Sequence, residues 1–212
     1  MNPYFKTPPV VKNLLIVNCL IYLAMTLIPT VCVFCQKYLY LWWINNSFEP
    51  PFHSWQMVTN MFFHISLNPS DSNFWHLFGN MFALWMFGRT LEYEIGSKRF
   101  LIYYLVCGVG AALIQMGVAS IFGENLVLLG ASGAVMGVLL AFGLMHPNNM
   151  IYIMPLPFPI KAKWFVIGYA VLELLLGSSG LDTGIAHFAH IGGMLWGLVL
   201  LLVWKKQGKI YF

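Results

Sequence analysis

Long apolar stretches alternate with short polar connections along most of the chain. A helix needs roughly 20 apolar residues to cross the hydrocarbon of a bilayer. The stretches predict six membrane-spanning helices, at about residues 11–29, 75–92, 100–122, 131–146, 162–179 and 186–204. The expected fold class is an all-α membrane protein, a six-helix bundle whose short central helix carries Ser132.

The composition excludes a water-soluble surface. Charged residues make up 8% of the chain and hydrophobic residues 59%, whereas about a quarter of a soluble domain is charged. The 212 residues leave room for the spans and little else, so we predict one membrane domain over residues 1–212. No small-x-small cleavage site follows the first apolar stretch, which favours a retained span over a secretory signal.

The basic residues fall unevenly on the two sides of the predicted bundle. With six spans, only Lys37 lies on one side, and the other side receives Lys6, Lys12, Arg89, Lys98, Arg99, Lys161, Lys163, Lys205, Lys206 and Lys209. Because basic loops stay in the cytoplasm, both termini are expected there. We expect a multi-pass protein of the bacterial inner membrane, in contact with the lipid bilayer and not with nucleic acid. The pattern leaves the oligomeric state open.

The loop over residues 38–56 is too polar and too broken by proline to cross a membrane, but it contains Trp42, Trp43 and Trp55. Tryptophan favours the headgroup region, so we predict an element that lies in the membrane interface. Cys32 and Cys35 form a C-x-x-C pair just before it. Two small apolar residues or one local disulfide are favoured there over a redox or metal site.

The fourth predicted span is short and begins with the sequence GASG. From Ala131 to His146 it has about 16 residues, or ~24 Å of helix, against ~30 Å of hydrocarbon. Its start is therefore expected below the outer membrane surface, where the backbone of residues 125–130 needs a protein-lined or water-filled cavity. Ser132 would face this cavity. A serine in a first helical turn is otherwise a cap or a small packing residue.

Small residues predict a close contact between the fourth and sixth spans. The two small-xxx-small faces are formed by Gly133 with Gly137 and by Gly193 with Gly197. If these faces meet, His190 lies about one turn above Gly193 and can reach Ser132. A histidine hydrogen-bonded to a serine is the minimal activated nucleophile. Alternatively, His190 is a structural histidine whose hydrogen bonds are satisfied within the bundle. His187 is expected to form a hydrogen bond or to pack against its neighbours, and not to take part in catalysis.

On the second predicted span, His76 and Asn80 are four residues apart and share a helix face. Their side chains can donate hydrogen bonds to an oxyanion, together with the backbone N–H of Ser132. The N-terminus of the fourth helix adds partial positive charge at the same point. The alternative for this pair is a polar clamp between helices. The pattern predicts a nucleophile, a base and oxyanion donors in one outward-facing pocket.

Three motifs, in this order, resemble the rhomboid family of intramembrane serine proteases. They are H-x-x-x-N in FWHLFGNMFALWMFGRTLE, the serine motif GASG, and A-H-x-x-G-x-x-x-G in AHIGGMLWG; the resemblance covers residues 55–197, and LEYEIGSKRF also matches. It implies a dyad of Ser132 and His190 without a third acidic residue. His76, Asn80 and the Ser132 backbone N–H would form the oxyanion hole. The implied substrates are single-span membrane proteins, and no cofactor or metal is implied.

The chain departs from the family pattern in three places. Four residues after Ser132 the family usually has an aromatic residue beneath the histidine, whereas this chain has Met136. Trp55-Gln56 stands where a Trp-Arg pair is frequent, and the stretch between His64 and His76 is longer than in the compact form. Either the fifth span or the aromatic loop would move to admit a substrate.

Glu173, inside the fifth apolar stretch, has no assigned role. It could line the cavity or be protonated there. His64, His76, His187 and His190 could bind a metal, but no carboxylate stands at ligand spacing among them.

Other protein classes fit less well. A soluble α/β-hydrolase would have G-x-S-x-G, but position 134 is alanine and no alternating strand pattern surrounds it. H-E-x-x-H of an intramembrane metalloprotease is not in the sequence. A transporter would need polar residues on both sides of the membrane. The main alternative is a catalytically silent relative that binds transmembrane clients, and the retained Ser132 and His190 favour the enzyme.

Overall fold

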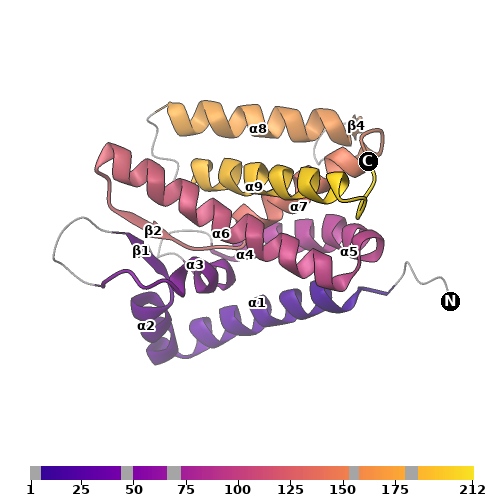
Figure 1. Ribbon diagram of the computed structural model, residues 1–212. Coiled ribbons are helices and arrows are strands. Elements are labelled where there is room, and N and C mark those ends of the chain that lie inside the picture. The colour runs from indigo at the N-terminus through magenta and orange to yellow at the C-terminus, as the bar shows by residue number, and fades with distance from the viewer. Residues whose placement is uncertain (1–5, 44–49, 66–72, 153–157, 180–185) are drawn as a thin grey trace.

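The computed structural model describes residues 6–43, 50–65, 73–152, 158–179 and 186–212, and most of these are helical (Figure 1). The longer helices are α1 (Pro9–Leu27), α6 (Ser97–Phe122), α7 (Ser132–Met145), α8 (Ala162–Ser178) and α9 (His187–Lys206). The shorter ones are α2 (Pro29–Tyr38), α3 (Gln56–Thr59), η2 (Asn60–Phe62), α4 (Asn73–Ala83), η3 (Leu84–Gly88) and α5 (Arg89–Ile95). The longer stretch noted between His64 and His76 lies mostly outside the described residues.

Three of the helices in the described ranges, α1, α6 and α9, are long and apolar enough to cross a membrane, and α7 is a shorter apolar helix. The segments α4, η3 and α5 follow one another directly over residues 73–95, with π-helical turns in η3. Large apolar side chains such as Leu20, Phe78 and Leu175 remain exposed on the outer helices. Apolar surface of this extent is normally covered, here by lipid. The protein is therefore a mostly helical membrane protein.

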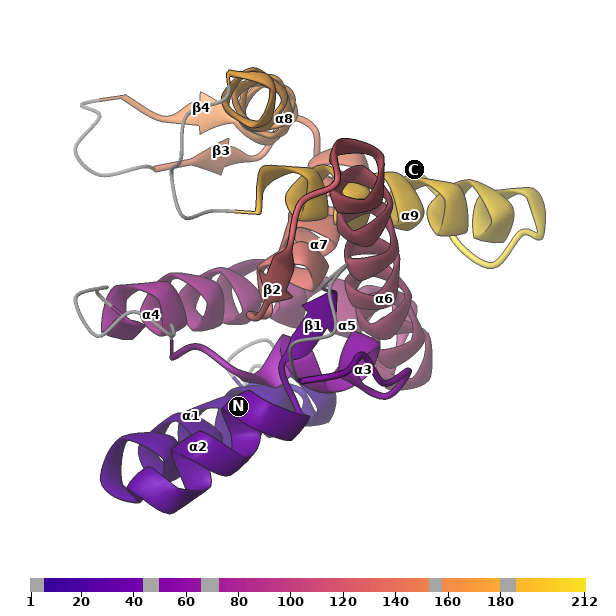
Figure 2. The ribbon, with the colours of Figure 1, turned by 90° about the vertical axis from the view of Figure 1, so that its left-hand side faces the viewer.

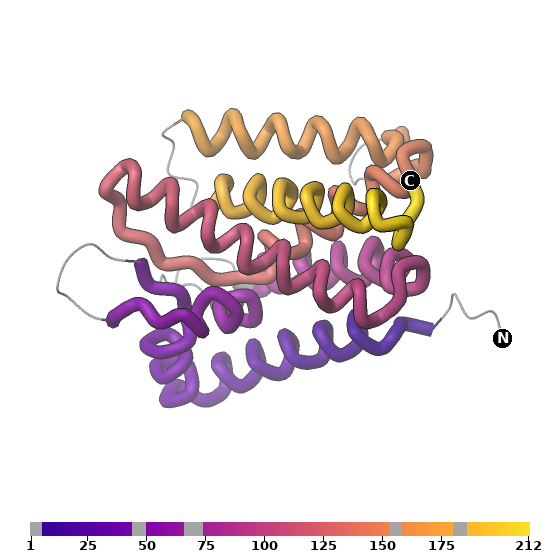
Figure 3. Tube along the Cα trace, in the orientation of Figure 1, coloured from indigo at the N-terminus to yellow at the C-terminus, as the bar shows by residue number. Residues whose placement is uncertain are grey.

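The buried helix α7 organises the bundle. It packs against α6, α9, α8 and η3, and Figure 2 shows it between the α6–α9 layer and the run that begins with α4. Most of its residues are buried and none is charged. A helix that is apolar all round is typical of a core position. α8 and α1 lie at opposite edges of the bundle (Figures 1 and 3).

Glycines allow α9 to lie directly against α7. A Cβ on Gly193 would lie 1.9 Å from the carbonyl oxygen of Gly133, and one on Gly137 would lie 3.0 Å from the carbonyl oxygen of Gly193. The first distance is far below van der Waals contact, so only glycine fits at position 193 in this arrangement.

The same glycine faces also contact α6. A Cβ at Gly133, Gly137 or Gly197 would lie, in that order, 2.4 Å from Ala111 Cβ, 2.3 Å from Cys107 Sγ and 2.4 Å from the Tyr103 hydroxyl. The glycines therefore serve a three-helix contact, whereas the sequence analysis considered only the fourth and sixth spans.

Two short strands precede the site, where no strand was expected. β1 (Leu41–Trp43) pairs antiparallel with β2 (Leu126–Leu128), and Leu41 lies opposite Leu128. A second small sheet joins β3 (Met150–Ile151) to β4 (Ile160–Lys161). The β1–β2 pairing gives the backbone that leads toward Ser132 hydrogen-bond partners from the aromatic loop, of which residues 44–49 lie outside the described residues.

Side chains of the first third of the chain stabilise this loop. Gln56 is fully buried, and its Oε1 accepts hydrogen bonds from the backbone N–H groups of Trp42 and His53, at 3.3 and 3.1 Å. Its Nε2 donates to the carbonyl oxygen of Tyr38 at 3.4 Å.

Cys32 and Cys35 lie in α2 as free cysteines, so the local disulfide considered from the sequence does not form.

Glu92 in α5 receives the N-terminus of α1. Its two carboxylate oxygens accept the backbone N–H groups of Val10 and Val11 at 2.9 and 2.7 Å, and the Ser97 hydroxyl donates to the same group at 2.6 Å. The first N–H groups of a helix have no partner within the helix, and the helix dipole favours a negative charge there. Glu92, which is 2% exposed, therefore joins α1 to the rest of the bundle.

Glu92→Gln is expected to reduce the free energy of unfolding by about 1–3 kcal/mol, because one buried N–H then loses its acceptor and the charge at the helix terminus is removed. Thermal unfolding in detergent micelles measures the effect. Glu94→Gln is the control, since Glu94 is 36% exposed and pairs with His146 at the surface. An equal loss of stability in both variants would refute this role of Glu92.

Candidate active site

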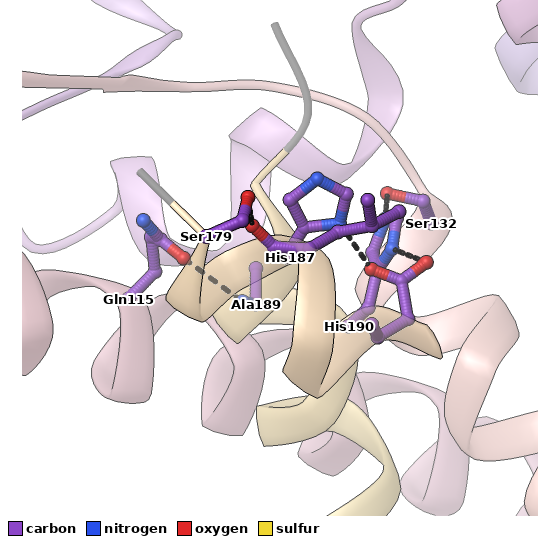
Figure 4. A network of polar contacts seen from close by, with 8 residues as sticks. Gln115, Ser132, Ser179, His187, Ala189 and His190 are labelled. Atoms are coloured by element: carbon purple, nitrogen blue, oxygen red, sulfur yellow. Dashed lines mark hydrogen bonds and ion pairs between the residues drawn. The ribbon is translucent and has the colours of Figure 1, made fainter. Parts of the chain in front are cut away.

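Ser132 is the first residue of α7, and Ala131 occupies the N-cap position. No side-chain hydrogen bond from this N-cap residue caps the helix. Ser132 Oγ lies 2.8 Å from Nε2 of His190, which is in the first turn of α9 (Figure 4). The two residues are 58 positions apart in the sequence, and the contact of α7 with α9 brings them together. Gln115 of α6 accepts the backbone N–H of Ala189 at 2.9 Å and so fixes the start of α9.

The second ring nitrogen of His190 faces a carboxylate. His190 Nδ1 lies 2.9 Å from Glu173 Oε1, and the other oxygen, Oε2, is hydrogen-bonded to Nδ1 of His187 at 2.6 Å. The Nδ1–Oε1 distance is that of an ion pair, but the ring N–H is not aligned with the oxygen as a hydrogen bond requires. Glu173 is 4% exposed. The dyad that the resemblance implied therefore has a buried carboxylate beside it.

The sequence contained part of the signal for this contact. Glu173 is the single acidic residue of α8, and an ionisable residue inside a membrane span normally faces the bundle interior and a partner. The rotation of α8 that turns Glu173 toward α9 depends on side-chain packing, which the apolar pattern does not encode.

His76 lies beside Ser132, whereas Asn80 is engaged within its own helix. Gly130 has a φ of +110°, and a Cβ at this position would lie 3.1 Å from His76 Nε2 and 3.8 Å from Ser132 Oγ. His76, Gly130 and Ser132 therefore border one small space. Asn80 is buried, and its Nδ2 donates to the backbone carbonyl of His76 at 2.9 Å, which leaves its second amide hydrogen for another acceptor.

The loop from α3 contributes residues that the sequence analysis did not select. A hollow next to Ser132 is bordered by Asn60, Gly130, Gly133 and Ala189, with apolar side chains around them. The carbonyl oxygen of Asn60 accepts the N–H of Gly130 at 2.9 Å.

Met136 is partly buried against the core. Within the described ranges, no group of three or more His, Cys, Asp or Glu side chains is arranged to hold a metal ion.

His64 holds the residue just before the serine. Its Nε2 accepts the backbone N–H of Ala131 at 3.3 Å, and its ring lies edge-on to that of His76, with 5.2 Å between centroids. Burial, and then the neighbouring His76, lower the pKa of His64 to about 3. The ring is therefore neutral at physiological pH, as an acceptor at Nε2 requires.

Acidification is expected to destabilise the fold through His64. The unfolded imidazole takes up a proton near pH 6.5, but the folded one does so only near its pKa of about 3. The unfolded chain therefore binds more protons between these values, and stability falls as pH falls through this window. The melting temperature of the wild type should drop from pH 7 to pH 5 more steeply than that of His64→Gln. Parallel slopes would show that His64 does not contribute.

These features define a class: helical membrane proteins in which a buried central helix presents a serine to a histidine of a neighbouring helix. The Rhomboid domain family matches residues 51–207 of the chain. The chain belongs to the rhomboid family, whose members are generally intramembrane serine proteases.

Named relatives come from mitochondria and chloroplasts. Rhomboid protein 1, mitochondrial, of Saccharomyces cerevisiae is 30% identical over 200 residues, which is 92% of this chain and 54% of the relative. The bovine Presenilin-associated rhomboid-like protein, mitochondrial, is 29% identical over 71% of this chain and 40% of its own length. Rhomboid-like protein 11, chloroplastic, of Arabidopsis thaliana is 29% identical over 73% and 54%.

The chain thus spans about half the length of the curated relatives that it matches. The compartments in their names disagree with the bacterial inner membrane expected from the sequence. That expectation used only the distribution of basic residues, which follows the same rule in membranes of different origin.

Proposed function

We propose that the protein is an intramembrane serine endopeptidase that cleaves single-span transmembrane substrates, with Ser132 as nucleophile and His190 as general base. The observation that carries the proposal is the 2.8 Å contact between Ser132 Oγ and His190 Nε2. This distance is within the range for an activated serine. Membership of the rhomboid family supports the same reaction class.

The contact supports the following sequence of steps. His190 Nε2 takes the proton of the Ser132 hydroxyl while Oγ attacks the substrate carbonyl carbon, and the C=O electron pair moves onto oxygen. The tetrahedral intermediate collapses, the C–N bond breaks, and the imidazolium gives its proton to the leaving amine. Water then hydrolyses the acyl-enzyme by the same path. These steps need no cofactor.

The proposed oxyanion donors are His76, Asn80 and the backbone N–H of Ser132. His76 and Ser132 border the space beside Gly130, and the N-terminus of α7 supplies partial positive charge there. One amide hydrogen of Asn80 is already bonded within α4, so Asn80 would use the second. Donors aimed at the developing oxyanion commonly supply the largest part of such catalysis.

The proposed membrane arrangement has six spans around central α7, with both termini on the side rich in basic residues. It is supported by the positions of α1, the α4–α5 run, α6, α7, α8 and α9, which lie close to the six apolar stretches. The site is proposed to open toward the opposite side. A helical substrate would have to unwind there, because a helical peptide bond is shielded by its own hydrogen bonds.

The test is cleavage of a single-span reporter by the purified protein in liposomes, with the products identified by mass spectrometry. The wild type is expected to cut within or near the membrane segment, and Ser132→Ala is expected to leave the reporter intact. A wild type that binds the reporter without cutting it would refute the proposal in favour of the silent client-binding relative.

A further inference from the structure

Glu173 is a buried carboxylate held between two imidazoles. Its Oε1 lies 2.9 Å from His190 Nδ1 and its Oε2 lies 2.6 Å from His187 Nδ1. The side chains of Glu173 and His187 are each 5% exposed, and that of His190 is 8% exposed. A carboxylate removed from water to this degree is costly unless charges or hydrogen bonds compensate it. The two imidazoles provide this compensation.

The carboxylate selects one tautomer of His190. The Ser132 hydroxyl can donate to Nε2 only when Nε2 carries a lone pair, and the proton of the neutral ring is then on Nδ1. A carboxylate 2.9 Å from Nδ1 favours the proton at this nitrogen. Because the N–H is not aligned with Oε1, the attraction in this arrangement is electrostatic more than a directed hydrogen bond. It becomes stronger when the ring gains a positive charge.

We infer that Glu173 positions His190 and stabilises its imidazolium, so that the catalytic set is an acid–base–nucleophile triad, Glu173–His190–Ser132, with the acid on a different helix from the base. The inference rests on the proposed function. During attack, the Oγ–H proton moves to Nε2, the Nδ1 proton stays on the ring, and Glu173 remains an ionised carboxylate. The positive charge on the ring is then balanced by Oε1 in a site of low dielectric constant.

Because Glu173 is in α8 and the base is in α9, the triad depends on how these helices pack. His187, one turn before His190, holds Oε2 and leaves Oε1 for the base. A purely structural alternative exists: Glu173 could simply join α8 to α9 through His187. The two roles differ in which contact matters, Oε1 with His190 or Oε2 with His187.

Three variants separate these roles in the reporter cleavage assay. Glu173→Gln keeps the shape and removes the charge, and it is expected to lower kcat by roughly 10²-fold or more with KM little changed. Glu173→Asp keeps the charge and should restore part of kcat. His187→Gln removes the imidazole that holds Oε2 and leaves the contact of Oε1 with His190 in place, so it should lower kcat much less than Glu173→Gln. Equal losses of kcat in Glu173→Gln and His187→Gln would overturn the inference in favour of the helix clamp.

A second measurement does not depend on cleavage. Nitrogen-15 NMR of labelled histidine in micelles reports the tautomer of each ring, and the His190 signals are those that disappear in His190→Gln. The Nδ1–H tautomer is expected to dominate in the wild type and to fall in Glu173→Gln. An unchanged tautomer in Glu173→Gln would contradict the positioning role.

The outcomes distinguish this inference from the proposed function. If the wild type cleaves and Glu173→Gln cleaves equally fast, Glu173 has no positioning role and the dyad of Ser132 and His190 stands. If the wild type does not cleave, both the proposed function and the catalytic role of Glu173 are refuted, whatever tautomer His190 has.

Discussion

Replacing His190 by alanine is expected to lower kcat/KM for a single-span reporter by about 10³-fold or more, and Ser132→Ala by at least as much. The imidazole lies 2.8 Å from Oγ, and its removal deprives Ser132 of the base that accepts the hydroxyl proton. An unactivated hydroxyl is a weak nucleophile at neutral pH. Initial rates of reporter cleavage in liposomes measure the loss.

The double variant and a matched histidine control sharpen this result. Residues that act as one unit are strongly non-additive, so Ser132→Ala/His190→Ala should be no slower than the slower single variant. His146→Ala is the control, because His146 lies at the other end of α7 and pairs with Glu94 near the surface. Its activity should match the wild type. Independent, multiplying losses in the double variant would mean that the two residues do not work together.

Gly193→Ala is expected to have the largest structural effect, a loss of about 3 kcal/mol or more in the free energy of unfolding. The new Cβ would lie 1.9 Å from the carbonyl oxygen of Gly133. Backbone atoms of two packed helices cannot turn aside as a flexible side chain can, so α9 must move away from α7. This movement would also separate His190 from Ser132, and cleavage should be lost even where the variant remains folded.

Gly117→Ala is the matched control, since a Cβ at position 117 of α6 would meet nothing within 4 Å. Alanine is a better helix former than glycine, so this variant should be as stable as the wild type or slightly more stable. Thermal unfolding in micelles compares the three proteins. If Gly193→Ala is as stable as Gly117→Ala, the close packing of α7 and α9 does not hold in solution.

The apolar stretches predicted a mostly helical membrane protein, because a chain in lipid must satisfy its backbone hydrogen bonds within each segment. Ser132 and His190 could be brought together from the sequence alone, because glycine spacing indicates which helix faces can approach closely. The spacing indicated one helix pair, and it did not indicate the packing of Gly137 on Cys107 of α6.

Other features depend on contacts that no local pattern encodes. The pairing of β1 with β2 joins three-residue segments far apart in the chain, too short to show alternation. Glu173 could be selected as unusual, but its partners depend on the rotation of α8 about its own axis. Most residues of α8 are themselves apolar, on every side of the helix. Their pattern therefore does not indicate which side of α8 faces α9.

The reaction of Ser132 with a fluorophosphonate probe tests the central claim, activation of Ser132 by His190, most directly. Intact-protein mass spectrometry with peptide mapping should find one adduct, on Ser132, in the wild type. Folded His190→Ala should react at least about 10³-fold more slowly. Labelling of Ser132 in His190→Ala at the wild-type rate, or an adduct on another residue, would contradict the account.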